Sequence, residues 1–273
     1  MNILHAIPSR GRVGRIKTLD NLGLVYPRIP LVLFVPNKES AAYVDTYAAD
    51  RIVSVRNDNG ARHIGAAREA IMDFAHKFGH THVIMWDDDL RFAARRKDDA
   101  TKFEELTQGT AKKMMADLHH LAREYGHFAL GAREGGNQRA PGIEENTRML
   151  RVLGYNVKAY RASGASFARS NGKEDFDVAL TMLRAGYASA ITNDYVSDNA
   201  GGTGAPGGCS SYTSRDGHGK AAEALAKRHP GFVRLVKKTT KVAWGGGERT
   251  DVVISWKKAA AAGKADQGVR RLL

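Results

Sequence analysis

The sequence has one cysteine, few acidic residues and no long hydrophobic run. The first and the last of these features argue against a disulfide-bonded protein and a membrane-spanning protein. Cys209 alone cannot form an internal disulfide, which indicates a reducing compartment such as the cytoplasm. It stands among glycines and serines without a catalytic signature, so a packing or loop role is expected. No window approaches the roughly 18 apolar residues of a membrane span, and the N-terminus lacks the basic part of a signal peptide. We therefore expect a cytoplasmic protein with neither a membrane partner nor an obligate protein partner.

The shortage of acidic residues gives the chain a formal net charge of +13, from 42 Lys and Arg against 29 Asp and Glu. From residue 215 to the end, fourteen Lys and Arg stand against five Asp and Glu, which leaves +9 in the last fifth of the chain. Clustered positive charge attracts polyanions through counter-ion release, and nucleic acid is the commonest candidate. A solvated basic tail that only aids solubility would leave the same pattern, so charge alone does not name the partner.

The first half of the chain alternates predicted strands and helices. Hydrophobic residues make up 42% of the sequence and the length of 273 residues allows a large core. Apolar runs predict strands over residues 2–7, 31–35, 51–55 and 82–86, and apolar residues at helical spacing predict helices over 13–22, 38–49 and 62–78. This order predicts an α/β domain with a doubly wound, mostly parallel sheet.

The second half is less regular, with no internal repeat and no sharp linker. The sequence predicts helices over 109–125, 175–185 and 219–227, and strands over 128–130, 187–195, 232–236 and 252–256. We expect a hairpin or two short strands within 155–167, a glycine-rich lid over 201–208 and a mobile tail over 259–273.

Three consecutive carboxylates, Asp87–Asp89, follow the apolar run Val83–Trp86. Adjacent like charges repel and need water or a counter-ion, and Mg²⁺ and Mn²⁺ prefer carboxylate oxygens. Ligands bind at the carboxyl ends of strands in open α/β sheets, and alternate residues of a strand face the same way. Asp87 and Asp89 are therefore the predicted metal ligands, while Asp88 would face a ribose or a neighbouring arginine. The alternative is a solvated acidic turn without a ligand.

A second cluster directly follows the first predicted strand and consists of Pro8, Ser9, Arg10 and Arg12, with a glycine between the arginines. Backbone amides that open a helix, together with arginines, would hold a phosphate or a nucleotide base. Many basic loops share this composition, so the motif alone is weak.

Two arginines, Arg62 and Arg68, lie on the helix predicted before the acidic strand. A separation of six residues places them on different faces of a helix. Arg68 lies near an apolar stripe and is a candidate contact for a diphosphate, with a surface salt bridge as the alternative.

A further group of carboxylates, Glu174, Asp175 and Asp177, begins a predicted helix. Carboxylates at a helix N-terminus are favoured by the dipole, so capping alone explains them. The functional interpretation makes one of them, Asp175 by preference, a general base that deprotonates an acceptor hydroxyl. Asp198 and His218, on either side of the glycine-rich segment, are possible third metal ligands, although a histidine in a loop is more often merely exposed.

These ordered motifs resemble the GT-A class of glycosyltransferases: a first strand that ends in Ile-Pro-Ser-Arg, Arg68 before an Asp-Asp-Asp strand end, and a later Glu-Asp-Phe-Asp helix followed by Gly-Tyr. More narrowly, Ile7–Arg12, the Gly207–Gly208 segment followed by a tyrosine, and the basic end resemble the TET-associated glycosyltransferases of bacteriophages. The resemblance covers approximately residues 2–257.

The resemblance implies a GT-A fold, a nucleotide-sugar donor with UDP-glucose favoured, and Mn²⁺ or Mg²⁺ held by Asp87 and Asp89. It implies that the Pro8–Arg12 loop holds the nucleotide and that Asp175, with Glu174, activates the acceptor. The narrower resemblance implies transfer to the hydroxymethyl group of a modified pyrimidine in DNA, 5-hydroxymethylcytosine favoured, in a host cytoplasm if the protein is phage-encoded.

The resemblance also implies a division of the chain. We expect a single domain over residues 1–257, with a nucleotide-sugar-binding half (1–106) and an acceptor-binding half (107–257), and a basic tail over 258–273. Two other enzymatic interpretations remain at this point: the same chemistry on a polysaccharide, lipid or protein acceptor, and a two-metal nuclease or nucleotidyltransferase. A basic DNA-binding protein without enzymatic activity is the last alternative.

Overall fold

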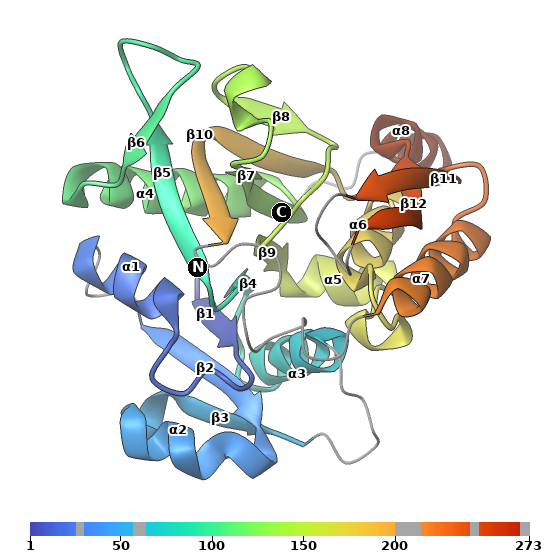
Figure 1. Ribbon diagram of the computed structural model, residues 1–273. Coiled ribbons are helices and arrows are strands. Elements are labelled where there is room, and N and C mark those ends of the chain that lie inside the picture. The colour runs from blue at the N-terminus through green and yellow to red at the C-terminus, as the bar shows by residue number, and fades with distance from the viewer. Residues whose placement is uncertain (26–29, 57–63, 200–213, 241–245, 268–273) are drawn as a thin grey trace.

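The fold is described by a computed structural model (Figure 1). The described residues are 1–25, 30–56, 64–199, 214–240 and 246–267. Predictions about Arg62, Cys209 and the glycine-rich segment 201–208 lie outside these residues.

A mixed sheet forms the centre of the molecule, and the described residues contribute ten strands to it, in the order β3-β2-β1-β4-β9-β7-β10-β5-β6 with β8 beside β10. Strands β1 to β4 are parallel neighbours, as the alternation of strands and helices predicts. Strand β9 then runs antiparallel between β4 and β7, and β7 and β10 are parallel again. The bounds are Ile3–Pro8 (β1), Leu31–Pro36 (β2), Ile52–Val55 (β3), His82–Trp86 (β4), Leu90–Arg95 (β5), Phe103–Glu105 (β6), His127–Ala132 (β7), Ile143–Glu145 (β8), Val152–Asn156 (β9) and Ser189–Asn199 (β10).

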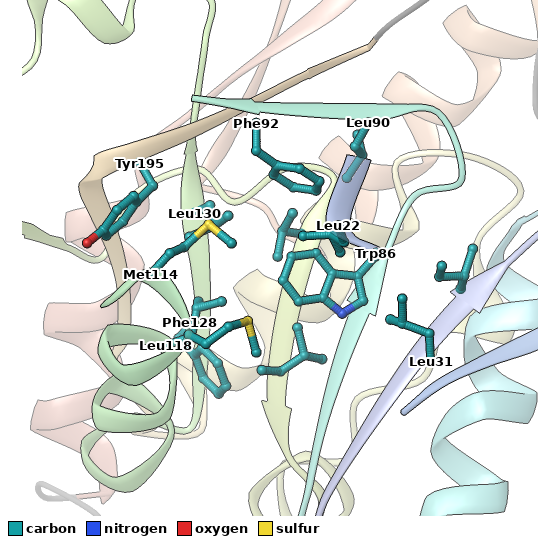
Figure 2. Packing of buried hydrophobic residues seen from close by; sticks show 14 of the residues in the cluster. Leu22, Leu31, Trp86, Leu90, Phe92, Met114, Leu118, Phe128, Leu130 and Tyr195 are labelled. Atoms are coloured by element: carbon teal, nitrogen blue, oxygen red, sulfur yellow. The ribbon is translucent and has the colours of Figure 1, made fainter. Parts of the chain in front are cut away.

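Helices cover both faces of this sheet, which confirms the α/β class. Their bounds are Lys17–Val25 (α1), Ser40–Thr46 (α2), Ile64–Lys77 (α3), Gln108–Glu124 (α4), Val157–Ser163 (α5) and Glu174–Arg184 (α6). Alternate residues of β4 supply the two cores: Ile84 and Trp86 pack with α1 and α4, and Val83 and Met85 pack with α3, α5 and α6. Figure 2 shows Trp86 among side chains from β5, α1 and α4.

The segment 155–167 differs from its prediction, because it is mainly helical and contains no hairpin. Strand β9 ends at Asn156, whose side chain accepts a hydrogen bond from the amide of Ala159 at 2.9 Å and so caps α5. A 3₁₀ turn, Phe167–Arg169, follows. The aromatic residues that suggested strands instead pack in the core, where Tyr155, Tyr160 and Phe167 contact one another.

The predicted mobile tail was wrong for residues 259–267, which lie in helix α8 (Trp256–Gln267). Ala259 and Ala260 are buried, and a Cβ placed on Gly263 would lie 2.0 Å from the carbonyl oxygen of Leu183. Alanine favours helix, and small residues allow α8 to approach α6 closely. Residues 268–273 lie outside the described part.

The last described elements form a unit that we call the C-terminal module: α7 (Arg215–Arg228), β11 (Val233–Thr240), β12 (Gly247–Ile254) and α8. The antiparallel pair β11–β12 and the two helices pack against α6 through their own hydrophobic cluster, at the right of Figure 1. No helix in the described ranges is long and apolar enough to cross a membrane.

Candidate functional site

The acidic triplet Asp87–Asp89 follows β4 directly, beside the segment Pro8–Arg12 that ends β1 and continues beyond it. The two segments meet because β1 and β4 are parallel neighbours, so their carboxyl ends share one edge of the sheet. Thr18 fixes the turn that carries the triplet: its hydroxyl donates to the carbonyl of Asp87 at 2.5 Å and accepts from the amide of Leu90 at 2.8 Å.

Asp88 is buried and joins the triplet to the Pro8–Arg12 segment. One carboxylate oxygen accepts from the hydroxyl of Ser9 at 2.8 Å, and the other accepts from Nη1 of Arg12 at 2.7 Å. The sequence predicted that Asp88 would face a ribose or a neighbouring arginine, and the structure shows that it binds an arginine. Burial raises the pKa of Asp88 to about 7, although the nearby Arg12 guanidinium acts in the opposite direction.

The prediction that the amides of this segment open a helix was wrong. Helix α1 begins only at Lys17, and the intervening residues form a loop in which Gly11 has a φ of 66°. Three of the loop's amides already have acceptors: Ser9 donates to the carbonyl of Phe34, Gly11 to the carboxylate of Glu39, and Arg12 to the hydroxyl of Tyr43. A ligand at this loop would therefore meet side chains rather than a helix N-terminus.

Arg68 connects the triplet to the beginning of α6. Its guanidinium is buried; Nη2 donates to Asp87 at 2.8 Å and Nη1 donates to Glu174 at 2.7 Å. Arg68 therefore forms a buried ion pair and not the surface salt bridge that was the alternative, while its contact with a diphosphate stays a prediction. Burial raises the pKa of Glu174 to about 7, against the attraction of Arg68.

Arginines already balance part of the charge that suggested a metal. Asp89 pairs with Arg12 at 3.0 Å and accepts from the side-chain amide of Asn199 at 2.8 Å, while Asp87 pairs with Arg68. Repulsion within the triplet therefore does not by itself demand a metal ion.

A metal ion fits this site only if the substrate supplies ligands. The described residues contain no group of three or more His, Cys, Asp or Glu that could hold a metal. Asp198 pairs with Arg91 at 3.3 Å, and His218 lies 3.5 Å from Asp251, so neither joins Asp87 and Asp89 in such a group. Two carboxylates completed by phosphate oxygens and water are, however, a usual set for Mg²⁺.

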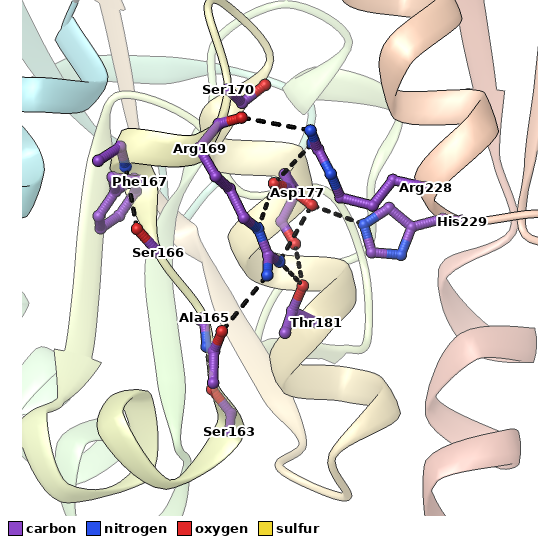
Figure 3. Close-up of polar contacts among 12 residues, drawn as sticks. Ser163, Ala165, Ser166, Phe167, Arg169, Ser170, Asp177, Thr181, Arg228 and His229 are labelled. Carbon is purple, nitrogen blue, oxygen red and sulfur yellow. Dashed lines mark hydrogen bonds and ion pairs between the residues drawn. The ribbon is translucent and has the colours of Figure 1, made fainter.

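The three carboxylates at the start of α6 have different surroundings. Glu174 is bound by Arg68, whereas Asp177 is fully buried and is bound by Arg169, Arg228 and His229 (Figure 3). Asp177 therefore ties the C-terminal module to α6. The side chain of Asp175 is half-buried and accepts from the amide next to it, so among the three it is the least engaged by cations within hydrogen-bonding distance.

Asn199 and Arg151 also belong to this site, although the sequence does not single them out. Asn199 ends β10 and donates to Asp89. The carbonyl of Arg151 accepts from the amide of Asp87 at 3.0 Å, and Arg151 has a φ of 62°, which is rare outside glycine. Both residues reach the triplet only through pairing in the sheet, so no local motif in the sequence identifies them.

A cavity of about 400 Å³ lies beside this edge of the sheet, between β5, β6 and β10. The residues that line it include Arg91 and Asp198, which are close in sequence to Asp89 and Asn199. Phe103 and Arg133 also line it. The guanidinium of Arg133 lies over the ring of Phe103, with 5.3 Å between the guanidinium carbon and the ring centroid. The cavity is lined by residues near the triplet in sequence, but the triplet itself and the carboxylates of α6 are not part of its lining.

Comparison with known proteins gave one family match and two similar curated proteins. A family model described as TET-Associated Glycosyltransferase matches residues 5–204. The chain is 27% identical to a protein named Beta-glucosyl-HMC-alpha-glucosyl-transferase from Enterobacteria phage T6 over 242 residues, which cover 84% of this chain and 81% of that protein. The protein of the same name from Enterobacteria phage T2 is 27% identical over 244 residues, with the same coverage.

Among solved structures, mannose-1-phosphate geranyltransferase from Thermus thermophilus is similar with a TM-score of 0.46 and 11% sequence identity. The similarity covers 84% of this chain and 81% of that one.

Proposed function

Because the chain belongs to the TET-associated glycosyltransferase family, we propose that it transfers a sugar from a nucleotide-sugar donor, UDP-glucose favoured, to a hydroxymethylated pyrimidine in DNA. Glycosyl transfer follows from the family. The donor, the metal and the acceptor are our proposals. The observation that carries them is the position of Arg68, which brings the acidic triplet and the carboxylates of α6 to one edge of the sheet.

The donor would lie across the carboxyl ends of β1 and β4. Pro8, Ser9, Arg10 and Arg12 would border the nucleotide, and Asp88 would hold Ser9 and Arg12 in place through its two hydrogen bonds. Arg68, which pairs with Asp87, is the proposed contact for the diphosphate, and Arg62 is a proposed contact outside the described residues. Bound Mn²⁺ or Mg²⁺, held by Asp87 and Asp89 with the donor phosphates, would neutralise the departing diphosphate.

The carboxylates at the beginning of α6 would act on the acceptor. Asp175 is the preferred general base, because its side chain lies in the first turn of α6 and no guanidinium among the described residues forms a hydrogen bond with it. Glu174, which is bound by Arg68, would hold that turn in position next to the triplet. It is also the second candidate for the general base. In either case the carboxylate takes the proton of the acceptor hydroxyl as the oxygen attacks the sugar.

The acceptor proposal is supported by the charge of the C-terminal module. The module contains exposed basic side chains on each of its helices and on β11, including Lys227, Lys237 and Lys257. Such a surface suits a polyanion, whereas a small neutral acceptor would not need it. Asp177 ties this module to the helix that carries the proposed base.

The names of the phage T2 and T6 proteins favour a second acceptor. They specify transfer of an α-glucosyl group to β-glucosyl-HMC, so the acceptor hydroxyl there belongs to a sugar already on the base. The same reaction on this chain would require hydroxymethylated DNA that already carries glucose. The basic module and the carboxylates of α6 suit either DNA.

The test is transfer of label from radiolabelled nucleotide sugars, in the presence of Mn²⁺, to three DNAs of one sequence: unmodified, hydroxymethylated, and β-glucosylated at the hydroxymethyl group. We expect label in one or both modified DNAs and none in the unmodified DNA, with transfer falling steeply as salt is raised. Label in a polysaccharide, lipid or protein acceptor but in none of the DNAs would contradict the proposed acceptor. Cleavage of DNA or nucleotide incorporation without a sugar donor would contradict the reaction.

A further inference from the structure

We propose that Asp251, in the C-terminal module, is a positioning residue for the catalytic carboxylates of α6, so that the module completes the active site in addition to binding DNA. The proposal rests on the proposed function, because it takes Glu174 and Asp175 as the carboxylates that act. Asp251 lies beyond residue 204, where the match to the family model ends.

Asp251 on β12 forms a buried ion pair with Lys173. Its Oδ1 accepts from Nζ of Lys173 at 2.8 Å, and the two side chains are only 10% and 8% exposed. His218 on α7 lies close to both, 3.3 Å from Nζ of Lys173 and 3.5 Å from Oδ1 of Asp251. The other carboxylate oxygen pairs with Lys238 and Arg249. Both oxygens of Asp251 are therefore engaged, and the position of Lys173 is fixed from the module.

Lys173 is the residue on which the start of α6 depends. It immediately precedes Glu174, and its carbonyl accepts from the amide of Asp177 at 3.0 Å in the first turn of the helix. Its backbone has a φ of 55° and a ψ of 26°, a left-handed conformation that residues other than glycine rarely adopt. The surroundings must hold such a residue in place, and the pair with Asp251 does so. A shift of Lys173 would move the carboxylates of Glu174 and Asp175 with it.

The fold has other means of attaching the module. Asp177 binds Arg228 and His229, and the hydrophobic cluster that includes Val233 and Val252 packs against α6. A buried ion pair is in general weak support for stability, because desolvation of both charges offsets their attraction. We therefore assign the Lys173–Asp251 pair mainly to positioning the start of α6, next to the carboxylates. Its contribution to holding the module against α6 is smaller.

The test compares Asp251→Asn with Glu248→Gln, a matched control on the same strand. Glu248 is exposed and pairs with Lys237 at 3.4 Å across the β11–β12 ladder, so the two variants change the charge of the module equally. We expect Asp251→Asn to lower kcat for sugar transfer by about 10- to 100-fold, as small displacements of reacting groups do, with KM for donor and for DNA unchanged. Glu248→Gln should keep the wild-type kcat.

A double variant separates positioning from stability if Asp251→Asn alone does not fold. Lys173→Met with Asp251→Asn removes both charges of the buried pair, and the two other cations that pair with Asp251, Lys238 and Arg249, are 48% and 26% exposed. We expect this variant to fold, to remain slow, and to exchange amide hydrogens faster than wild type in a peptide spanning residues 173–178.

A wild-type kcat and wild-type exchange in either folded variant would overturn the proposal, as would an equal loss of kcat in Glu248→Gln. If the wild-type protein transfers no sugar at all, the proposed function fails, and hydrogen exchange alone then decides whether Asp251 orders the start of α6.

Discussion

Arg68 and Glu174 are 106 positions apart in the chain, yet they form a buried ion pair with 2.7 Å between Nη1 and Oε1. Through its other terminal nitrogen Arg68 also holds Asp87. One guanidinium therefore connects helix α3, the end of β4 and the start of α6. This connection makes a single site of carboxylates that the sequence places in two separate motifs.

Replacing Arg68 by methionine should destabilise the protein and stop transfer. The substitution leaves the carboxylates of Asp87 and Glu174 without their buried cation, which in other proteins costs about 3–5 kcal/mol. Urea denaturation followed by circular dichroism measures the change. The control is Arg96→Met, whose arginine forms an exposed pair with Asp98. Equal unfolding midpoints for the two variants would show that the Arg68 bridge does not stabilise the fold.

The stability of the protein should depend on pH through Glu174. Its pKa is about 7 in the folded protein because of burial, against an ordinary value of 4.5. A proton bound more tightly in the folded state stabilises it fully below the unfolded pKa, and this stabilisation is lost as pH rises through about 7. The free energy of unfolding of wild type, relative to Glu174→Gln, should therefore rise as pH falls from about 8 to about 5. A difference that is constant over this range, or that rises with pH, would mean that the pKa of Glu174 is not raised.

Asp89 should be required for transfer but not for folding. Asp89→Ala removes one of the two carboxylates proposed to hold the metal, so transfer should be abolished while the circular dichroism spectrum stays that of wild type. Chelation should also stop the wild-type reaction, and added Mn²⁺ should restore it. The control is Asp20→Asn, a residue in the first turn of α1. Full activity of Asp89→Ala, or of wild type in excess chelator, would exclude the metal-dependent reaction.

The exposed lysines of the C-terminal module should contribute to DNA binding and not to the chemical step. Neutralising the exposed Lys227 and Lys257 together should raise KM for DNA and flatten its dependence on salt by about one unit of slope for each phosphate that is no longer neutralised. The value of kcat at saturating DNA should not change. Lys38→Gln, in the exposed turn after β2, is the control and should leave KM unchanged. An unchanged salt dependence in the double variant would place the DNA elsewhere.

Helix α8 should not tolerate a larger residue at Gly263. A Cβ there would lie 2.0 Å from the carbonyl oxygen of Leu183, so Gly263→Ala should lower the free energy of unfolding by about 1–3 kcal/mol. The matched control is Gly23→Ala in α1, where a Cβ meets nothing within 4 Å and should stabilise the helix by about 0.5–1 kcal/mol. Thermal unfolding of both variants tests this packing, and a stabilising Gly263→Ala would mean that residues 256–267 do not pack on α6.

The sequence predicted the elements whose signal is local. The apolar runs of β1, β2 and β4 predicted strands correctly because these strands are buried on both faces. The periodicity of α3, α4 and α6 also predicted helices correctly, and α3 and α4 each bury one face. The position of the triplet at the end of β4 followed from the apolar run of that strand. The prediction for segment 155–167 was wrong, because its aromatic residues are as compatible with a helix and a turn as with strands. The cap at Asn156 favours the helix.

The pairing within the site could not be predicted from the sequence. Nothing in the spacing shows that Arg12 binds Asp88 and Asp89, that Arg68 binds Glu174, or that Asn199 reaches Asp89. These contacts depend on which strands become neighbours across the sheet, and strand order is a property of the whole chain. For the same reason, the repulsion among three adjacent carboxylates suggested a metal ion, whereas Arg12 and Arg68 already balance part of that charge.

The proposed transfer of a sugar to a modified pyrimidine in DNA can be measured by mass spectrometry of nucleosides. Hydroxymethylated and β-glucosylated DNA would be treated with the protein and a panel of nucleotide sugars and then digested. We expect a hydroxymethylpyrimidine nucleoside that has gained one sugar with wild type and none with Asp89→Ala. The absence of any newly glycosylated nucleoside from both DNAs with every donor, in a folded wild-type preparation, would contradict the proposed transfer.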